Sequence, residues 1–328
     1  MQFTNNTERT SRSVQETNID LHFHSRHSDG ALWPAELAIR LQEQSVGIAA
    51  LTDHDTLQGV PCFLEEARKL GIRAIAAVEI DFTDTDYGFE SEILGYFPKC
   101  SYENTQKYLE EFQKNRSNLA HAALEKAATR WKNQSISHEG LILYKSGGHG
   151  AVDVRDAAVF SISKYDIFGY LHSLGLVSDD YGPFKTEFFS DAEFERYGAK
   201  PEFSRCIEVI RQDGGFPVLA HPGYQWKKDA SAMFAASNVV VPNLRKAKEH
   251  GLWGIECHAY QSPESAITIN QVVKGWATEA GLHLTCGSDF HRDNEKNYPN
   301  VGCCCEALPT IHSGDLIKHI ELALAEWF

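Results

Sequence analysis

The residues of this sequence that are best suited to chemistry are histidines and carboxylates placed at the ends of short apolar segments. His22 and His24 alternate with Ile19, Leu21 and Phe23, which is the two-residue period of a short strand. Both imidazoles should therefore point to the same face of that strand. Because neutral imidazole is the commonest side-chain ligand of metal ions, we expect His22 and His24 to bind one metal ion together.

The same pattern recurs along the chain. Later apolar segments end in His54, in Glu79, in His221, in Glu256 with His258, and in Asp289 with His291. Taken singly, each has an ordinary alternative: His54 could cap a helix, His221 could precede the turn at Pro222, and Glu79 could form an ion pair. In a closed parallel barrel, however, the carboxyl ends of all strands lie at one face, where active sites are built. Their joint placement predicts one metal cluster.

The ligand types narrow the choice of metal. Imidazoles and carboxylates without a convincing set of thiolates suit Mn²⁺, Fe²⁺ or Zn²⁺, and they disfavour an oxygen-only Ca²⁺ site. So many ligands exceed the needs of a single ion. We expect two or three divalent metal ions, bridged by a carboxylate such as Glu79.

Hydrophobic periodicity predicts the elements that position these residues. Residues 18–98 read as a βαβαβ unit whose near-continuous apolar strands indicate a parallel sheet buried on both faces. Helical spacing then dominates, with one long helix or two short ones over residues 103–132, so residues 99–200 are expected to be an inserted, mainly helical subdomain that acts as lid and specificity element. The α/β pattern resumes over 201–328, including a helix that Pro242 opens and a last helix over 313–326. Residues 1–17 are polar and are expected to form a flexible tail.

Composition limits the classes of partner. The chain has 328 residues, of which 42% are hydrophobic and 23% charged, and its formal net charge is −14. That charge argues against binding to duplex DNA or to acidic membranes, but not against a small phosphorylated substrate held through cations. No apolar run approaches the roughly 20 residues of a membrane helix, and the N-terminus lacks the apolar core of a signal peptide. The eight cysteines show no C-x-x-C spacing, so we expect free thiols and a cytoplasmic location.

Taken together, the motifs resemble the polymerase and histidinol phosphatase (PHP) family. The matching segments are Asp20-Leu21-His22-Phe23-His24 with Ser28-Asp29-Gly30, Thr52-Asp53-His54-Asp55, Val78-Glu79-Ile80, Leu219-Ala220-His221-Pro222, Gly254-Ile255-Glu256 and Gly287-Ser288-Asp289-Phe290-His291. They occur in the family's order and span residues 18–98 and 203–291. The resemblance implies a distorted (β/α)7 barrel of PHP type, with a trinuclear metal site that hydrolyses phosphoesters.

The resemblance also implies which residues hold each ion. The first ion would be held by His22, His24, Glu79 and Asp289, the second by Asp29, His54 and His291, and the third by Glu79, His221 and Glu92. In the family the last of these positions is usually a histidine. We therefore expect the carboxylate of Glu92 to alter the affinity or the identity of the third ion.

Substrate contacts and catalysis are expected from a few further groups. Arg155 stands in an Arg-Asp-Ala segment where relatives often read Arg-Pro-His, and it is our first candidate for phosphate binding. Arg116 on the long helix is a second candidate. We assign catalytic roles to His221, His258 and Asp289, with His258 also near the phosphate.

The helical insertion between the Leu-Gly-Tyr and His-Pro segments is similar to that of family members acting on nucleotide phosphates. The resemblance therefore implies a metal-dependent phosphoesterase in which a metal-bound hydroxide attacks a phosphomonoester of a small, nucleotide-like substrate such as AMP or a 3′,5′-bisphosphate. Histidinol-phosphate phosphatase is the nearest alternative enzyme. A second alternative is a PHP module that binds metal without turnover. A third is an amidohydrolase-like enzyme acting on C–N bonds, although such sites usually include a bridging lysine and no strand end here offers one.

Overall fold

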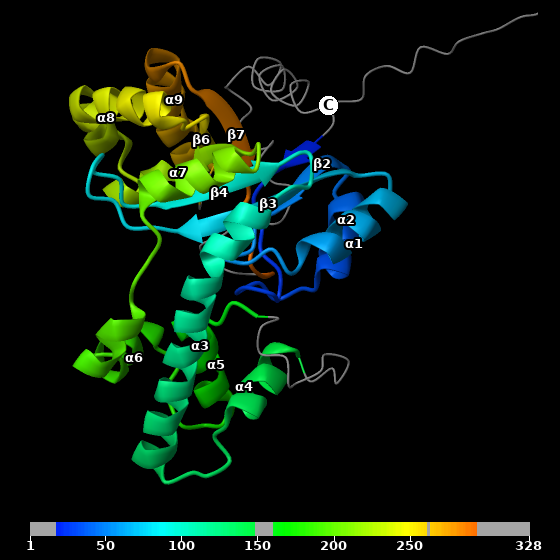
Figure 1. Cartoon of the computed structure of the whole chain (residues 1–328), viewed down its shortest axis with the longest axis vertical. Helices are drawn as coiled ribbons and strands as arrows, with labels where there is room; N and C mark the ends of the chain where they lie inside the picture. The colour runs from blue at the N-terminus through cyan, green and yellow to red at the C-terminus, as the bar shows by residue number, and fades with distance from the viewer. Residues whose placement is uncertain (1–17, 148–159, 261–262, 294–328) are drawn as a thin grey trace, which may run out of the picture.

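A nearly closed barrel of seven strands forms the centre of the computed structural model, which describes residues 18–147, 160–260 and 263–293 (Figure 1). The strands are β1 (Asn18–Asp20), β2 (Val46–Leu51), β3 (Arg73–Asp81), β4 (Glu92–Phe97), β5 (Phe216–Leu219), β6 (Gly254–His258) and β7 (His283–Gly287). They are hydrogen-bonded in chain order. The segment after β7 lies beside the segment after β1, with the His24 amide donating to the Phe290 carbonyl at 2.8 Å. The predicted seven-stranded barrel is thus confirmed.

Strand β4 corrects the prediction of a wholly parallel sheet. It runs antiparallel to both β3 and β5, while the remaining neighbours pair in parallel. The physical reason is the connection: residues 82–91 contain no helix that could carry the chain back for a parallel crossover. As a consequence, Glu92 at the start of β4 lies at the same barrel end as Glu79 near the end of β3.

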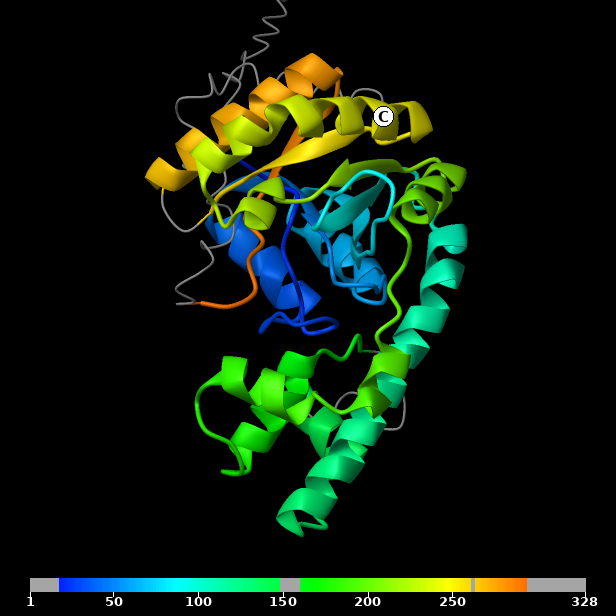
Figure 2. The ribbon, with the colours of Figure 1, turned by 90° about the vertical axis from the view of Figure 1, so that its left-hand side faces the viewer.

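Helices cover the outside of the barrel and form a second lobe beneath it. They are α1 (Pro34–Glu43), α2 (Val60–Lys69), α3 (Glu103–Trp131), α4 (His138–Lys145), α5 (Lys164–Ser173), α6 (Tyr181–Phe188), α7 (Phe203–Gln212), α8 (Ala230–His250) and α9 (Pro263–Ala280), with short 3-10 helices η2 (Ala192–Tyr197) and η3 (Pro222–Trp226). Figure 2 shows α8 and α9, in yellow and orange, side by side over the sheet. None of the described helices is long and apolar enough to cross a membrane.

The prediction that Pro242 opens a helix is wrong. Helix α8 already begins at Ala230, because the Asp229 side chain accepts hydrogen bonds from the amides of Ser231 (2.9 Å) and Ala232 (3.1 Å). Pro242 lies inside this helix. The predicted strand over residues 19–24 is also shorter than expected, since β1 ends at Asp20. The expected tail and the expected helix over 313–326 lie outside the described residues.

Helix α3 connects the two lobes. Leu109, near its start, belongs to the apolar core of the barrel, whereas Leu119, Ala123 and Ala127 belong to a separate core with residues of α4, α5 and α6. Figure 1 shows α3 leaving the barrel and running the length of the lower lobe. A core of its own supports the proposed division at residues 99–200, which stays a prediction.

Candidate metal centre

The expected metal ligands converge at one end of the barrel. All but Asp29, which lies in the loop between β1 and α1, stand beside a strand end. His22 and His24 follow β1, His54 follows β2, Glu79 lies near the end of β3, Glu92 begins β4, His221 follows β5, and Asp289 and His291 follow β7. Gly287 permits the close approach of β7 to β1, because a Cβ atom there would collide with the Cβ of His22.

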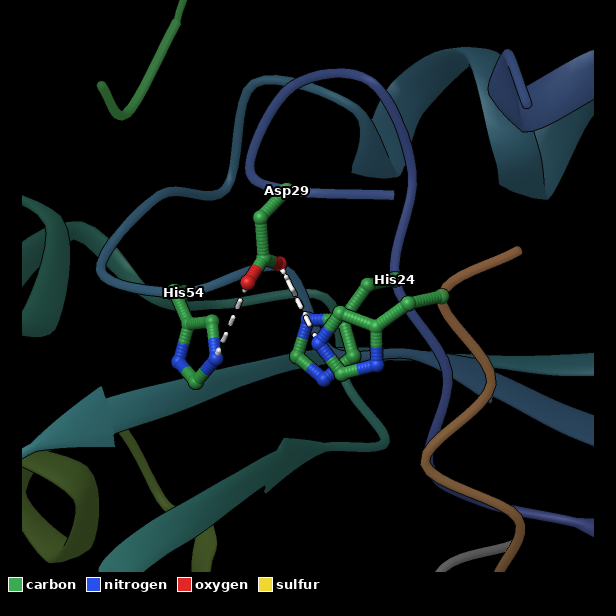
Figure 3. A group of neighbouring side chains, drawn as sticks. His24, Asp29 and His54 are labelled. Atoms are coloured by element: carbon green, nitrogen blue, oxygen red, sulfur yellow. Dashed lines mark ion pairs between the residues drawn. The ribbon is translucent and has the colours of Figure 1, made fainter. Parts of the chain in front are cut away.

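One group of ligands surrounds Asp29, and we call it the Asp29 cluster: His24, Asp29, His54 and His291. One donor atom from each residue lies within 4.8 Å of those from all the others. The Asp29 carboxylate is 3.7 Å from His24 Nδ1, 3.9 Å from His54 Nε2 and 3.3 Å from His291 Nε2. Figure 3 shows its two oxygens pointing toward His24 and His54. These contacts leave four donor atoms facing one another.

A second group lies deeper, and we call it the Glu79 cluster: His22, Glu79, His221 and Asp289. All four residues are buried. The Nε2 atom of His22 is 3.1 Å from Glu79 Oε2 and 3.3 Å from Asp289 Oδ1, while His221 Nε2 is 3.0 Å from Glu79 Oε1.

Glu79 belongs to both groups by contact. Its Oε2 atom is 3.2 Å from His24 Nε2 and 3.3 Å from His54 Nδ1 of the Asp29 cluster. Asp289 Oδ1 also lies 3.1 Å from His24 Nε2. The four residues implied for the first ion, His22, His24, Glu79 and Asp289, are therefore brought together, with Glu79 where a bridging carboxylate is needed.

In the described part of the chain, four buried donor atoms of the two clusters make no hydrogen bond, and this fits divalent ions. His22 Nε2, Asp29 Oδ1, His54 Nδ1 and Glu79 Oε2 are buried, yet none has a hydrogen-bond partner among the described residues. Buried polar atoms normally have such a partner. Ligands placed about 2.0–2.2 Å from a shared ion stand about 3 Å from one another, which is close to the separations around Glu79. With imidazole and carboxylate donors, the clusters can hold divalent transition metals.

Electrostatics in the clusters attract positive charge. Burial alone would lower the pKa of His24, but the hydrogen bond with Asp289 and the neighbouring carboxylate of Glu79 raise that pKa to about 10. Burial acts on Glu79 and Asp289 in the opposite sense, and the neighbouring histidines overcome it and hold both pKa values well below the usual range. The carboxylates thus stay ionised, as metal ligands must.

Three further carboxylates orient the ligands: Glu256, which the sequence placed among the strand-end residues of the cluster without assigning it to an ion, and Asp20 and Asp53, which it did not single out as site residues. Glu256 accepts hydrogen bonds from His22 Nδ1 at 2.9 Å and from the His221 amide at 2.8 Å. This leaves His22 Nε2 facing Glu79, the arrangement by which carboxylates orient metal-binding histidines.

Asp20 and Asp53 act on the backbone near the ligands. Asp20 accepts hydrogen bonds from the Ser288 amide at 3.0 Å and hydroxyl at 2.7 Å, next to Asp289. Asp53 accepts from the Ser25 amide at 2.7 Å and the Ser28 hydroxyl at 2.5 Å. Ser28 immediately precedes Asp29. Both carboxylates therefore hold the loops on which ligands stand.

Glu92 lies at the edge of the centre. Its Oε2 atom is 3.7 Å from His221 Nε2, and it belongs to neither four-residue cluster. Glu92 lines a cavity of about 860 Å³ together with Asp29, Glu79 and Asp289. The predicted third ion has its expected residues near one another, but its ligation by Glu92 stays a prediction.

His258 stands behind the cavity wall rather than in it. It is buried, and its Nε2 atom lies 3.2 Å from the hydroxyl of Tyr224, which does line the cavity. Burial lowers the pKa of His258 to about 4, the opposite of the shift at His24. Any contact of His258 with the phosphate would therefore pass through Tyr224.

Of the two arginines expected to bind phosphate, the structure describes Arg116. Arg116 is ion-paired with Asp55 and, at 3.6 Å, with Asp81. It lines a second cavity beside the metal centre. Arg155 lies outside the described residues, so its role stays a prediction.

A family model of the PHP domain matches residues 20–214. Among curated proteins, the chain is similar to a 5′-3′ exoribonuclease of Haemophilus influenzae, with 27% identity over 273 residues that cover 83% of this chain and 89% of the relative. It is also 46% identical over 63 residues to a 3′,5′-nucleoside bisphosphate phosphatase of Chromobacterium violaceum, covering 19% of this chain and 22% of the relative.

A solved structure supports the fold. A protein of Bifidobacterium adolescentis described as a metal-dependent phosphoesterase superposes with a TM-score of 0.64 at 21% sequence identity, covering 86% of this chain and 90% of the other. At this level of identity the likeness concerns the fold alone.

Proposed function

The chain belongs to the PHP domain family, and from this premise we propose that it hydrolyses a phosphomonoester of a small, nucleotide-like substrate. Its curated relatives act on phosphoric ester bonds, and the chain is a hydrolase of that class. The observation that carries the proposal is the position of Glu79, shared by two clusters of metal-ligand type beside a cavity of about 860 Å³. A cavity of this size accommodates a nucleotide-sized ligand.

Metal binding assigns a role to each cluster. We propose that His22, His24, Glu79 and Asp289 hold one ion, that Asp29, His54 and His291 hold a second, and that His221, Glu79 and Glu92 hold a third. Bound divalent ions neutralise phosphate oxygens and activate the attacking water. The metal-ligand atoms are held in place before substrate binds, because Glu256 restrains the side chain of His22 and because Asp20 and Asp53 restrain the loops that carry Asp289 and Asp29.

The chain's own groups also handle protons at the cavity wall. The Tyr224 ring lies 5.0 Å from the His221 ring, and its hydroxyl is held by His258 Nε2 at 3.2 Å. We propose that Tyr224 and His258 assist proton transfer at the ester oxygen. His258 would act through the hydroxyl of Tyr224. Lys200 and Lys227, which line the same cavity, supply positive charge toward an incoming phosphate.

RNA is a second candidate substrate. Relatives named 5′-3′ exoribonucleases each match 83% of this chain, whereas the nucleoside bisphosphate phosphatase matches only a short segment. The 5′ end of RNA presents the same chemical groups as a 3′,5′-bisphosphate: a sugar with phosphates on both sides. We place the small nucleotide first because the helical insertion resembles that of phosphoesterases acting on nucleotide phosphates. We expect the reaction in the cytoplasm, consistent with the free thiols of Cys62, Cys100, Cys206 and Cys257.

A substrate screen tests the proposal. The purified full-length chain is loaded in turn with Mn²⁺, Fe²⁺ or Zn²⁺ and offered AMP, adenosine 3′,5′-bisphosphate, histidinol phosphate and a 5′-phosphorylated RNA. We expect release of phosphate or mononucleotide with at least one metal and none from the His22→Ala/His24→Ala double variant. Turnover of histidinol phosphate alone would identify the protein as a histidinol-phosphate phosphatase. No turnover with any metal would refute the proposal.

A further inference from the structure

A second cavity, of about 310 Å³, lies between the barrel and the lower lobe. It is lined by Arg116 of α3, Lys164 at the start of α5, Lys185 of α6, and Lys200 ahead of α7, and we call it the lysine cavity. Its volume is at the lower end of the range for small-ligand pockets. None of these four side chains is an expected metal ligand, and only Lys200 also lines the larger cavity.

The charge of the lysine cavity is opposite to that of the chain. Four cations line it, against the two carboxylates of Asp55 and Asp81, which leaves a local excess of two positive charges in a protein of net charge −14. Both carboxylates are already engaged: Asp55 by Arg116, and Asp81 by Lys200 at 2.7 Å. Neither can neutralise the other lysines.

Lys164 and Lys185 are left without an anionic partner in the described part of the chain. Burial, followed by repulsion from Lys185 and Lys200, lowers the pKa of the half-buried Lys164. The nearest aromatic contact of its ammonium group is the ring of Phe189, at 5.0 Å. Like charges held together in this way indicate a site that an anion would relieve.

The lysine cavity adjoins the metal centre. Asp81 and Lys200 line both this cavity and the larger one that contains the clusters. Asp81 stands two residues after Glu79 on β3, or about 7 Å along the strand. Asp55 directly follows His54. A substrate bound at the metal centre would thus have its neighbouring groups at the entrance of the lysine cavity.

We propose that the lysine cavity is a second anion site, which binds a further phosphate group of the same substrate whose ester reaches the metal centre. The inference rests on the phosphoesterase function proposed above and adds a requirement for a second phosphate. That phosphate can be the other ester of a bisphosphate nucleotide or the next phosphodiester of an RNA end. Tyr181 and Tyr197 in the wall of the cavity offer rings and hydroxyls to the attached nucleoside.

The test removes the two unpartnered lysines. Lys164→Gln/Lys185→Gln is compared with Lys107→Gln/Lys114→Gln, which removes the same charge from exposed positions of α3 that line neither cavity. Calorimetry with metal-loaded full-length protein measures binding of non-hydrolysable phosphonate analogues of adenosine 3′,5′-bisphosphate and of AMP. We expect the first variant to weaken bisphosphate binding by roughly ten- to a hundredfold and to leave AMP binding within about twofold, because only the bisphosphate reaches both sites.

Kinetics with the metal-loaded protein identify the source of the phosphate. A fall in kcat/KM for the bisphosphate alone assigns the site to small nucleotides, and an equal fall for a 5′-phosphorylated dinucleotide extends it to RNA ends. Equal losses in the two lysine variants, or none in either, overturn the proposal. The calorimetric measurement tests the lysine cavity independently of the proposed hydrolysis. Even a protein that hydrolyses no phosphoester can prefer a ligand with two phosphates, and that preference either depends on Lys164 and Lys185 or does not.

Discussion

Glu256 determines how His22 faces the metal centre. Its two oxygens accept from His22 Nδ1 and from the His221 amide. Glutamine offers only one acceptor oxygen, so one of these N–H groups would lose its partner and the His22 ring would lose its orientation. Groups that orient a ligating histidine typically contribute ten- to a hundredfold to metal affinity. We expect Glu256→Gln to weaken Mn²⁺ binding by roughly that factor, measured by calorimetric titration.

The control for this change is Glu249→Gln, which replaces an exposed glutamate of α8 with the same loss of charge. It should bind Mn²⁺ like the unaltered protein. If the two variants bind equally well, Glu256 has no part in orienting His22.

We expect Glu92 to determine how many ions the centre holds. Its carboxylate lies 3.7 Å from His221 Nε2, at the position where the family usually has a histidine. A carboxylate is a harder donor than imidazole, so the third site should prefer Mn²⁺ or Fe²⁺ to Zn²⁺. We expect Glu92→Ala to lose one ion per chain in elemental analysis, whereas Glu90→Ala, a change in the same cavity wall, keeps the full content. Unchanged stoichiometry and metal preference in Glu92→Ala would refute this role.

Sequence reasoning at the residue scale singled out the expected ligands, which the structure brings together, but not the carboxylates of Asp20 and Asp53 behind them. His22, His54 and His291 are visible because each ends an apolar segment, and the barrel brings such ends together. Asp20 and Asp53 also stand at strand ends, but their role depends on hydrogen bonds to Ser288 and Ser28, from distant parts of the chain. No local pattern predicts such pairings.

The same limit applies at the scale of elements. Apolar runs correctly marked most strands, yet the direction of β4 follows from the connection before it rather than from its own residues. Pro242 suggested a helix start because proline favours that position, but the cap at Asp229 begins α8 earlier. The side on which Glu92 appears depends on this strand direction, so the geometry of the third site required the structure.

Lys145 ties the lower lobe to the loop that carries Asp29. Its buried ammonium group donates to the Ser28 carbonyl and to Asp166 Oδ1 at 2.6 Å. Lys145→Met would leave the Asp166 carboxylate without this partner and release the loop before Asp29. We expect a loss of about 1–3 kcal/mol in the free energy of unfolding, together with weaker binding of the ion that Asp29 holds, measured by denaturation and metal titration.

Lys126→Met provides the matched control. Lys126 also pairs with a carboxylate, Asp191 at 2.6 Å, and donates to the Phe188 carbonyl, but both partners lie within the lower lobe. This variant should lose stability and keep its metal affinity. Equal metal affinity in both lysine variants would show that the lobe does not support the Asp29 loop.

Asp213 caps α3 from another helix. Helix α3 has no side-chain cap of its own, and the Asp213 carboxylate accepts from the amide and side chain of both Asn104 and Thr105, at 2.7–3.1 Å. Burial alone would raise the pKa of Asp213, but these hydrogen bonds outweigh it and lower the pKa below its ordinary value of 3.8. The cap therefore stabilises the fold above that value and is lost as pH falls through the lower pKa of the folded state.

Asp213→Asn should reveal this dependence. We expect the variant to be about 1–3 kcal/mol less stable at neutral pH, since an amide cannot accept at both positions. The difference from the unaltered protein should shrink as pH falls below about 4, measured by chemical denaturation at a series of pH values. A difference that stays constant down to pH 2 would contradict the assignment.

At the scale of the whole molecule, the expected metal centre draws its ligands from nearly all strands of the barrel. Its ligands come from the ends of β1, β2, β3, β5 and β7, with Glu92 at the start of β4, so bound ions would connect six of the seven strands of the described sheet. The unfolded chain cannot assemble these distant donors. Metal binding should therefore stabilise the native state by mass action, by about 2.7 kcal/mol for one ion at a hundred times its dissociation constant.

Thermal unfolding of the full chain measures this linkage. With about 2–4 °C of Tm per kcal/mol for a large domain, added Mn²⁺ should raise Tm by roughly 5–10 °C over protein in chelator. The rise should grow with the logarithm of the ion concentration, because each tenfold increase adds about 1.4 kcal/mol. The His22→Ala/His24→Ala variant lacks the two imidazoles that contact the shared carboxylate Glu79, so its Tm should rise little when Mn²⁺ is added. Equal Tm values with Mn²⁺ and with chelator in the unaltered protein would mean that the convergent residues hold no ion, whatever the activity.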